Sequence, residues 1–158
     1  MQQLLVIGAL IILGSLVLTF NRSTQNVNAN NYFNIALIDA TASAQSVIEG
    51  IQTKAFDENT ITSSVSSAGS LTANATLGPD AGETITTQFD DVDDYKSYTE
   101  VDTFQQFGQF NISVDVNYVQ KYSPETISAS PTFLKKIDVT VSNSYLAHSL
   151  TLSRIISY

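Results

Sequence analysis

Residues 4–20 read LLVIGALIILGSLVLTF, an apolar run that contains no charged residue and no proline. Only Gly8, Gly14, Ser15 and Thr19 break it, and each of them is small or weakly polar. As a helix with about 1.5 Å of rise per residue, the run extends roughly 26 Å, slightly less than the hydrocarbon core of a bilayer. It therefore predicts a helix that is covered by lipid or by other apolar helices.

Three interpretations of this run compete, and the flanking residues favour two of them over a secretory signal. A secretory signal would begin with basic residues and end in a small-residue cleavage site, but residues 1–3 carry no charge and LTFNRS offers no such site. A transmembrane anchor fits the length, and Arg22 at its end is a weak orientation cue. The alternative is an oligomerising helix that resides in a membrane first and later packs in a bundle.

The composition of the whole chain excludes several classes of protein. Its 158 residues suit one domain with an appendage. Its 7 basic and 15 acidic residues give a formal charge of −8, so no basic stripe is available to displace counterions from phosphates. We therefore expect no nucleic-acid partner. The absence of cysteine excludes a disulfide framework and Cys-ligated zinc.

Residues 21–31, NRSTQNVNANN, are poor in helix-forming residues. Asn, Ser and Thr side chains compete for backbone hydrogen bonds, which predicts either a weak helix or an extended, melted segment that joins two helices, with an exposed flexible linker as the alternative. Helical periodicity returns over residues 32–56, because apolar side chains recur there every three or four positions. They are Phe33, Ala36, Leu37, Ala40, Ala44, Val47, Ile48, Ile51 and Phe56. This stripe predicts an amphipathic helix that packs under a sheet.

Residues 57–158 are predicted to form a β-rich head, which begins with a Ser/Thr-rich connector over residues 57–75 that holds a loop or a short strand and which has its main strands last. Residues 110–118 alternate between apolar and polar side chains, and residues 136–142 do the same. A final strand is expected from Leu150 to Tyr158. Alternation of this kind predicts an antiparallel sheet with one solvated face. The expected fold class is α+β, in which a long N-terminal apolar helix, with an interruption near residues 21–31 left open, packs against the C-terminal sheet.

The order of these segments resembles that of type IV pilins and pseudopilins. The apolar helix at the N-terminus precedes a second helical segment and a β-rich head, and mature pilins commonly carry a glycine where Gly14 stands. The pieces AQSVIEGIQTKAFDE, LGPDAGE, FDDVDDYKSY and KKIDVTVSN are similar to pilin-like proteins of the mannose-sensitive haemagglutinin pilus type. The chain departs from the pilin pattern at Leu5, where a glutamate is usual, and at Arg22, where a proline is common.

The resemblance implies a structural subunit of an extracellular helical filament that polymerises through its N-terminal helix, residues 1–20. The implied partners are further copies of the chain, the inner-membrane pilus assembly machinery and, before assembly, the cytoplasmic membrane. The residues expected to form the assembly helix are Leu4, Leu5, Val6, Ile7, Leu10, Ile11, Ile12, Leu13, Gly14, Leu16, Val17 and Leu18. One alternative is a minor pilin or a pseudopilin of a secretion system. The other is a single-pass membrane-anchored protein whose head binds a partner at the cell surface.

An acidic segment follows the second helix. From Asp80 to Asp102 the chain has eight carboxylates and one lysine. Carboxylates packed this closely repel unless they are solvated or bridged by a hard cation, and calcium prefers six to eight oxygen ligands. Asp90, Asp91, Asp93 and Asp94 are the candidate calcium ligands, although their spacing is not that of an EF-hand. The alternative is a solvated surface loop whose first aspartates cap a turn.

Residue patterns typical of catalysis do not stand out in the sequence. His148 is the single histidine and no G-x-S-x-G motif is present, so we expect His148 at the surface and no enzymatic activity. No cofactor other than calcium is expected. Three N-x-S/T sequons make Asn21, Asn74 and Asn111 candidate glycan acceptors.

Overall fold

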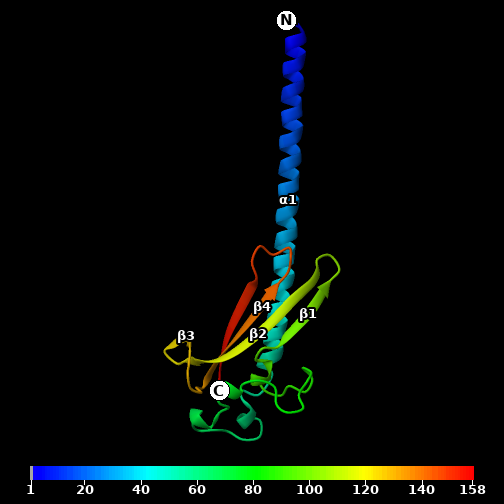
Figure 1. Ribbon diagram of the computed structural model, residues 1–158. Coiled ribbons are helices and arrows are strands. Elements are labelled where there is room, and N and C mark those ends of the chain that lie inside the picture. The colour runs from blue at the N-terminus through cyan, green and yellow to red at the C-terminus, as the bar shows by residue number, and fades with distance from the viewer. Residues whose placement is uncertain (1) are drawn as a thin grey trace.

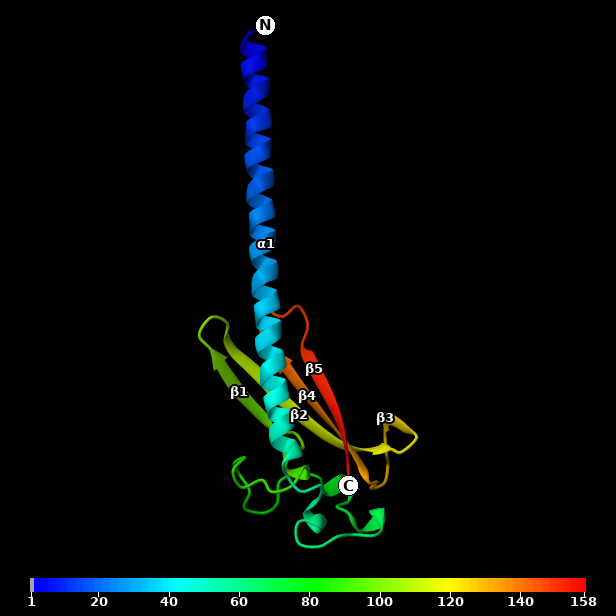
Figure 2. The same ribbon diagram turned by 180° about the vertical axis from the view of Figure 1, so that it is seen from behind.

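The computed structural model describes residues 2–158 and shows a long helix that projects from a sheet-bearing head (Figure 1). Helix α1, Gln2–Gln52, runs without a break for 51 residues, which corresponds to roughly 76 Å. Its first half stands clear of the head, whereas its second half lies along the sheet (Figures 1 and 2). This arrangement confirms the predicted α+β class. Met1, the first residue of the predicted 1–20 segment, lies outside the described residues.

The sheet has five strands, which pair antiparallel throughout. They are β1 (Thr99–Phe104), β2 (Gly108–Gln120), β3 (Ser123–Ile127), β4 (Leu134–Ser142) and β5 (Leu150–Ser157). Their order across the sheet is β1-β2-β4-β5, and the short β3 pairs with the end of β2. Strands β2, β4 and β5 lie where the sequence predicts strands. The sequence does not predict β1 and β3, because both are largely exposed and show no regular apolar face.

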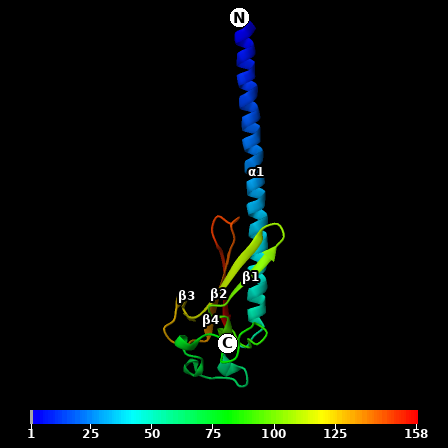
Figure 3. The same ribbon diagram turned by 45° about the vertical axis from the view of Figure 1, so that its right-hand side comes forward.

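The core lies between α1 and one face of the sheet, and the turned view shows the helix beside the sheet (Figure 3). The buried apolar positions of α1 are Ala36, Ala40, Ala44, Ile48 and Ile51. Alternate residues of β2 and β4 face them and are also buried: Phe110, Ile112, Val114, Val116, Ile137, Val139 and Val141. Small alanine side chains let the helix approach the sheet closely, and removal of these apolar groups from water stabilises the contact.

Residues 21–31 are helical, which agrees with the helical alternative and contradicts the melted segment and the flexible linker. Every side chain in this stretch is exposed, so the asparagines are solvated by water without displacing backbone hydrogen bonds. Thr24 Oγ1 donates to the carbonyl oxygen of Phe20 at 3.1 Å, which leaves the helical ladder in place. Because helix formation is cooperative, extension through poor helix formers costs little once the flanking turns have formed.

α1 ends at Gln52, before the predicted end at residue 56. The amides of Thr53 and Lys54 bond back to the carbonyl oxygens of Gly50 and Ile51 at 3.3 and 3.1 Å, which tightens the final turn. Ala55 then pairs with Asp91 in an isolated parallel bridge. This bridge brings the acidic segment against the residues that follow the helix.

Residues 57–98 contain little regular structure, and the strands of the head follow from Thr99 onward. The segment contains four 3₁₀ turns, namely η1 (Glu58–Thr60), η2 (Ala68–Ser70), η3 (Asn74–Thr76) and η4 (Asp93–Tyr95). Its Ser, Thr, Asn and Asp side chains bond to nearby backbone groups, which favours turns over strands. The segment wraps the end of the head farthest from the N-terminus (Figure 1).

Candidate functional site

The N-terminal half of α1 is an exposed apolar surface. All twelve residues predicted for the assembly helix are exposed, and the eleven large ones have exposed fractions of 54–74%. Soluble monomers rarely expose so much contiguous apolar surface, so a surface of this kind marks contact with lipid or with protein. Among the described residues, α1 is the helix that is long and apolar enough to cross a membrane.

The few polar groups in the apolar run are satisfied by the helix itself. Ser15 Oγ donates to the carbonyl oxygen of Ile12 at 2.8 Å, and Thr19 Oγ1 donates to that of Ser15 at 2.8 Å. The run therefore needs no water to satisfy its hydroxyl groups, which suits a hydrocarbon or bundle environment. A Cβ built at Gly8 or Gly14 meets no atom within 4 Å, so packing within this chain does not require glycine at either position.

The four candidate calcium ligands have different partners. Asp91 Oδ1 accepts hydrogen bonds from the amides of Asp93 and Asp94 at 2.5 and 3.1 Å. Asp94 Oδ2 accepts bonds from the amides of Asp90 and Asp91 at 2.9 and 3.1 Å. Asp93 forms an ion pair with Lys135. Asp91, Asp93 and Asp94 are buried, so a solvated surface loop describes only Asp90.

A different set of carboxylates converges near the surface. Carboxylate oxygens of Glu83, Asp90 and Asp94 lie within 4.8 Å of one another. Asp90 is exposed, Glu83 is partly buried and Asp94 is buried. Three acidic groups at this spacing are common without an ion, so a calcium ion in this segment stays a prediction.

Lys135 on β4 lies at the centre of a buried polar cluster. Its side chain has no exposed surface, and its Nζ forms one ion pair with Asp57 Oδ2 at 3.0 Å and another with Asp93 Oδ1. Nζ also donates to the carbonyl oxygen of Phe56 at 2.6 Å. The three donors of the ammonium group therefore meet three acceptors. Lysine is rarely buried without such partners, because transfer of a charge from water into the interior is costly.

Two aromatic rings and several backbone amides enclose this cluster. Lys135 Nζ lies 4.6 Å from the centre of the Phe56 ring and 4.8 Å from that of Tyr118. Tyr118 Oη donates to Asp57 Oδ2 at 2.6 Å. The amides of Asn59 and Thr72 donate to the same carboxylate at 3.2 and 3.1 Å. The cluster thus joins the end of α1, the irregular segment and the sheet.

The carboxyl groups of the cluster differ in acidity. Burial raises the pKa of Asp91 to about 8, and the carboxylates of Asp93 and Asp94 add to the effect. Burial also raises the pKa of Asp93 to about 6, although the Lys135 charge opposes it. At Asp57, the effect of burial is outweighed by hydrogen bonds from Tyr118 and Thr72 and by the Lys135 charge, which lower its pKa. At neutral pH Asp57 is therefore ionised, whereas Asp91 is mainly protonated.

Sequence reasoning selected none of Asp57, Tyr118 and Lys135, although one signal for Lys135 was present. Lys135 precedes Ile137 by two positions, so the alternation that buries Ile137 places Lys135 on the same face of the sheet. Tyr118 is the direct partner of Lys135 in the register of β2 and β4. The strand register that pairs Tyr118 with Lys135, and the position of Asp57 beside them, exist only in the folded chain and could not be deduced from the sequence.

The three candidate glycan acceptors differ in accessibility. Asn21 is exposed on α1, and Asn111 is exposed on β2. Asn74 is partly buried, and its Nδ2 donates to the carbonyl oxygen of Ser128 at 2.7 Å. Attachment of a glycan at Asn74 requires the loss of that hydrogen bond.

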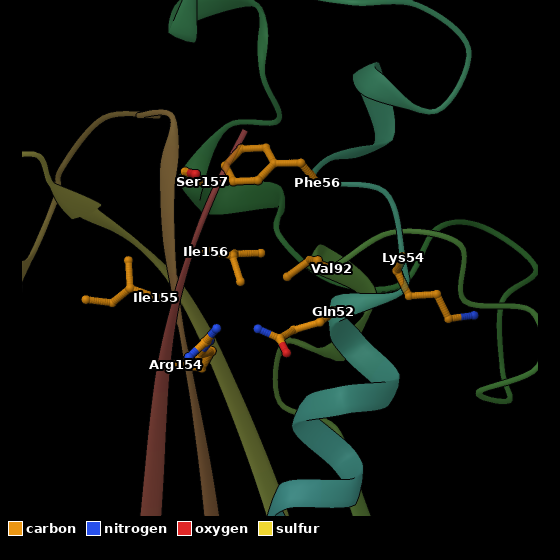
Figure 4. A pocket seen from close by; sticks show the side chains of 8 residues that line it. All are labelled: Gln52, Lys54, Phe56, Val92, Arg154, Ile155, Ile156 and Ser157. Carbon is orange, nitrogen blue, oxygen red and sulfur yellow. The ribbon is translucent and has the colours of Figure 1, made fainter.

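A pocket of about 330 Å³ lies between the end of α1 and β5 (Figure 4). Gln52 and Arg154 point toward each other across it, whereas Lys54 points away and donates to the carbonyl oxygen of Phe89 at 2.6 Å (Figure 4). The described residues that line the pocket include no carboxylate and no histidine, so it offers no acid–base pair. His148 is exposed in the connection between β4 and β5.

No protein family, curated protein or solved structure matches the chain.

Proposed function

We propose that the chain is a structural subunit of an extracellular, type IV pilus-like helical filament that polymerises through the apolar half of α1. The observation that carries this proposal is the continuous 51-residue helix, whose apolar first half extends beyond the head and packs against none of the described residues outside the helix. In a bundle of copies these side chains are buried against one another, and burial of apolar surface is the main favourable term in association.

The head suits the outside of such a filament. The chain carries a net charge of −8, and strand β2 presents Asn111, Ser113 and Asp115 to solvent. Contacts that repeat around a helical axis without closing produce an open filament. Before assembly the same helix resides in the cytoplasmic membrane, where the inner-membrane assembly machinery supplies subunits to the growing base.

Exposed apolar residues beyond the membrane-length run favour a filament over a simple anchor. Val27, Tyr32, Ile35 and Ile38 lie past residue 20 and have exposed fractions of 55%, 48%, 41% and 66%. A single-pass anchor leaves these side chains in water, whereas neighbouring helices in a bundle cover them. The filament therefore accounts for more of the exposed apolar surface than a single-pass surface protein does.

Electron microscopy of material sheared from cells that produce the chain tests the proposal. We expect fibres in the sheared fraction, with the chain identified in them by mass spectrometry. Quantification against the other fibre proteins separates a major subunit from a minor pilin or pseudopilin, which would be present in small amounts. The proposal fails if the chain stays in the membrane fraction and no fibre contains it.

A pair of variants separates assembly from membrane insertion. Ile38→Asp places a charge on the exposed side of α1 but outside the apolar run, so we expect normal membrane insertion and loss of fibres. Ile127→Asp is the matched control, because Ile127 on β3 is similarly exposed at 57% and lies off the helix. Equal fibre yields from the two variants would argue for the single-pass anchor.

A further inference from the structure

Lys135 and Asp93 are held together where no water separates them. The side chains of Lys135 and Asp93 are 0% and 3% exposed, and Nζ is in direct contact with Asp93 Oδ1. Two groups fixed in this way behave as reactants at a very high effective concentration. The same pair in solution would be hydrated and would meet only rarely.

The surroundings keep water away from both groups. The rings of Phe56 and Tyr118 cover the ammonium group, and Asp93 Oδ2 is buried without a hydrogen-bond partner. In a site of low polarity, transfer of a proton from the ammonium to the carboxylate removes two buried charges. The result is a neutral amine, which is a nucleophile, beside a carboxylic acid, which is an acceptor for it.

We propose that Lys135 Nζ and Asp93 Cγ become joined by an intramolecular amide bond, formed by the folded chain itself, with Asp57 as the proton carrier. Nζ attacks Cγ, and the new C–N bond forms as one C–O bond of the carboxyl group breaks. Overall, the ammonium gives up two protons and the carboxylate gives up one oxygen, and these leave as one water molecule. The two opposite charges disappear together, and no oxidant or reductant takes part.

Asp57 is placed to move the proton. Its Oδ2 lies 3.0 Å from Lys135 Nζ, and the same Nζ contacts Asp93 Oδ1, so both carboxyl groups meet at the attacking nitrogen. Asp57 can therefore accept a proton from the attacking nitrogen and deliver it to the departing oxygen. Hydrogen bonds from Thr72, Asn59 and Tyr118 hold Asp57 in its orientation.

Asp93 is the better acceptor of the two acids that contact Lys135. Asp57 is committed to several hydrogen-bond donors, which stabilise its carboxylate form and make its carbon a poor target. Asp93 has a free oxygen that can leave. After the bond forms, the amide N–H keeps an acceptor in the carbonyl oxygen of Phe56, which lies 2.6 Å from Nζ.

The bond would fasten the η4 turn covalently to β4 in a chain that has no cysteine. A covalent link between distant residues reduces the conformational freedom of the unfolded chain and thus stabilises the fold. Such a link suits a subunit exposed outside the cell, but the proposal does not depend on whether the chain forms filaments.

Intact mass spectrometry of the full chain, purified in detergent, tests the proposal with two isomeric variants. Lys135→Arg and Lys136→Arg have identical compositions, so their masses differ only if Lys135 has lost a water molecule. Lys136 is the control because its side chain lies near the surface, where it pairs with Asp138 at 3.1 Å. We expect Lys136→Arg to be one water molecule lighter than Lys135→Arg, whatever processing the N-terminus undergoes.

Protease digestion and tandem mass spectrometry then locate the bond. In the unsubstituted chain we expect a branched peptide that joins the segment around Asp93 to the segment around Lys135, and no tryptic cleavage after Lys135. Equal masses for the two arginine variants, together with an unbranched Lys135 peptide, would overturn the proposal. Asp57→Asn retains both reacting groups but lacks the carboxylate that carries the proton, so we expect this variant to lose most of the branched peptide. If the variant keeps the branched peptide in full, Asp57 has no part in the mechanism.

Discussion

Tyr118 Oη donates a 2.6 Å hydrogen bond to Asp57 Oδ2 and thereby ties the sheet to the segment that follows α1. The same carboxylate accepts bonds from the amides of Asn59 and Thr72, and it pairs with Lys135. Asp57 is thus the point at which residues 57–98, which contain little regular structure, are attached to the rest of the head. A buried network of this kind stabilises the fold only while each member keeps its partners.

Loss of the Tyr118 hydroxyl is expected to destabilise the head. Tyr118→Phe leaves the ring in place but removes a buried donor from Asp57, which should lower the free energy of unfolding by about 1–3 kcal/mol. Tyr122→Phe is the matched control, because Tyr122 is 93% exposed and its substitution should change stability by less than about 0.5 kcal/mol. Thermal and urea unfolding of the detergent-solubilised chain, followed by tyrosine fluorescence, measures both. Equal effects would contradict the role assigned to the hydrogen bond.

Stability is expected to depend on pH through Asp91. Because burial raises its pKa from 3.8 to about 8, the folded state keeps a proton that the unfolded state releases between these values. The contribution of Asp91 is therefore fully present below about pH 4 and is lost as the pH rises toward 8. The direction also holds if Lys135 and Asp93 are linked, because burial is the main cause of the shift.

Asp91→Asn provides the measurement for this pH effect. The asparagine resembles the protonated acid, and its side-chain oxygen can still accept bonds from the amides of Asp93 and Asp94. We expect urea unfolding at a series of pH values to show a shallower decline of stability with rising pH in this variant than in the unsubstituted chain. Parallel pH profiles for the two proteins would show that Asp91 does not titrate as described.

The close approach of α1 to the sheet predicts a strong size limit at Ala40. Ala40 has no exposed surface and lies in the core, so Ala40→Leu should overpack the contact and cost about 1–3 kcal/mol. Ala42→Leu is the control, because Ala42 is exposed on the same helix and leucine has nearly the helix propensity of alanine. A comparison of unfolding midpoints tests this. Similar midpoints would mean that the helix and sheet have room to separate.

The calcium prediction can be tested by thermal unfolding in calcium and in chelator. If the carboxylates of Glu83, Asp90 and Asp94 hold an ion, calcium stabilises the folded state by mass action and thereby raises the midpoint. The gain in the free energy of unfolding is about 2.7 kcal/mol at a calcium concentration 100 times the dissociation constant. Asp90→Asn should abolish this rise, whereas Glu125→Gln, whose carboxylate is 86% exposed on β3, should not. An unchanged midpoint for the unsubstituted chain contradicts the prediction.

Features with a regular period were predictable from sequence. The alternation in residues 110–118 located β2, and the three- and four-residue spacing of Ala36, Ala40, Ala44 and Ile48 marked the buried side of α1. Residues 21–31 were not predictable in this way, because local helix propensity is weak there and the cooperativity of a long helix outweighs it. The burial of Asp91, Asp93 and Asp94 could not be predicted from sequence, because carboxylates are ordinarily solvated and only the partners that meet them in the fold explain their burial.

The sequence by itself determined the exposed apolar helix, the α+β class and the strands that carry the core, because each depends on contacts between residues close in the chain or on strict alternation. Only the tertiary structure decided the cluster of Asp57, Asp93, Tyr118 and Lys135. Those residues are separated by up to 78 positions and come together through strand register and the turn after α1. A buried charge is tolerated only where such distant partners meet it, so its place in the fold cannot be deduced from neighbours in the sequence.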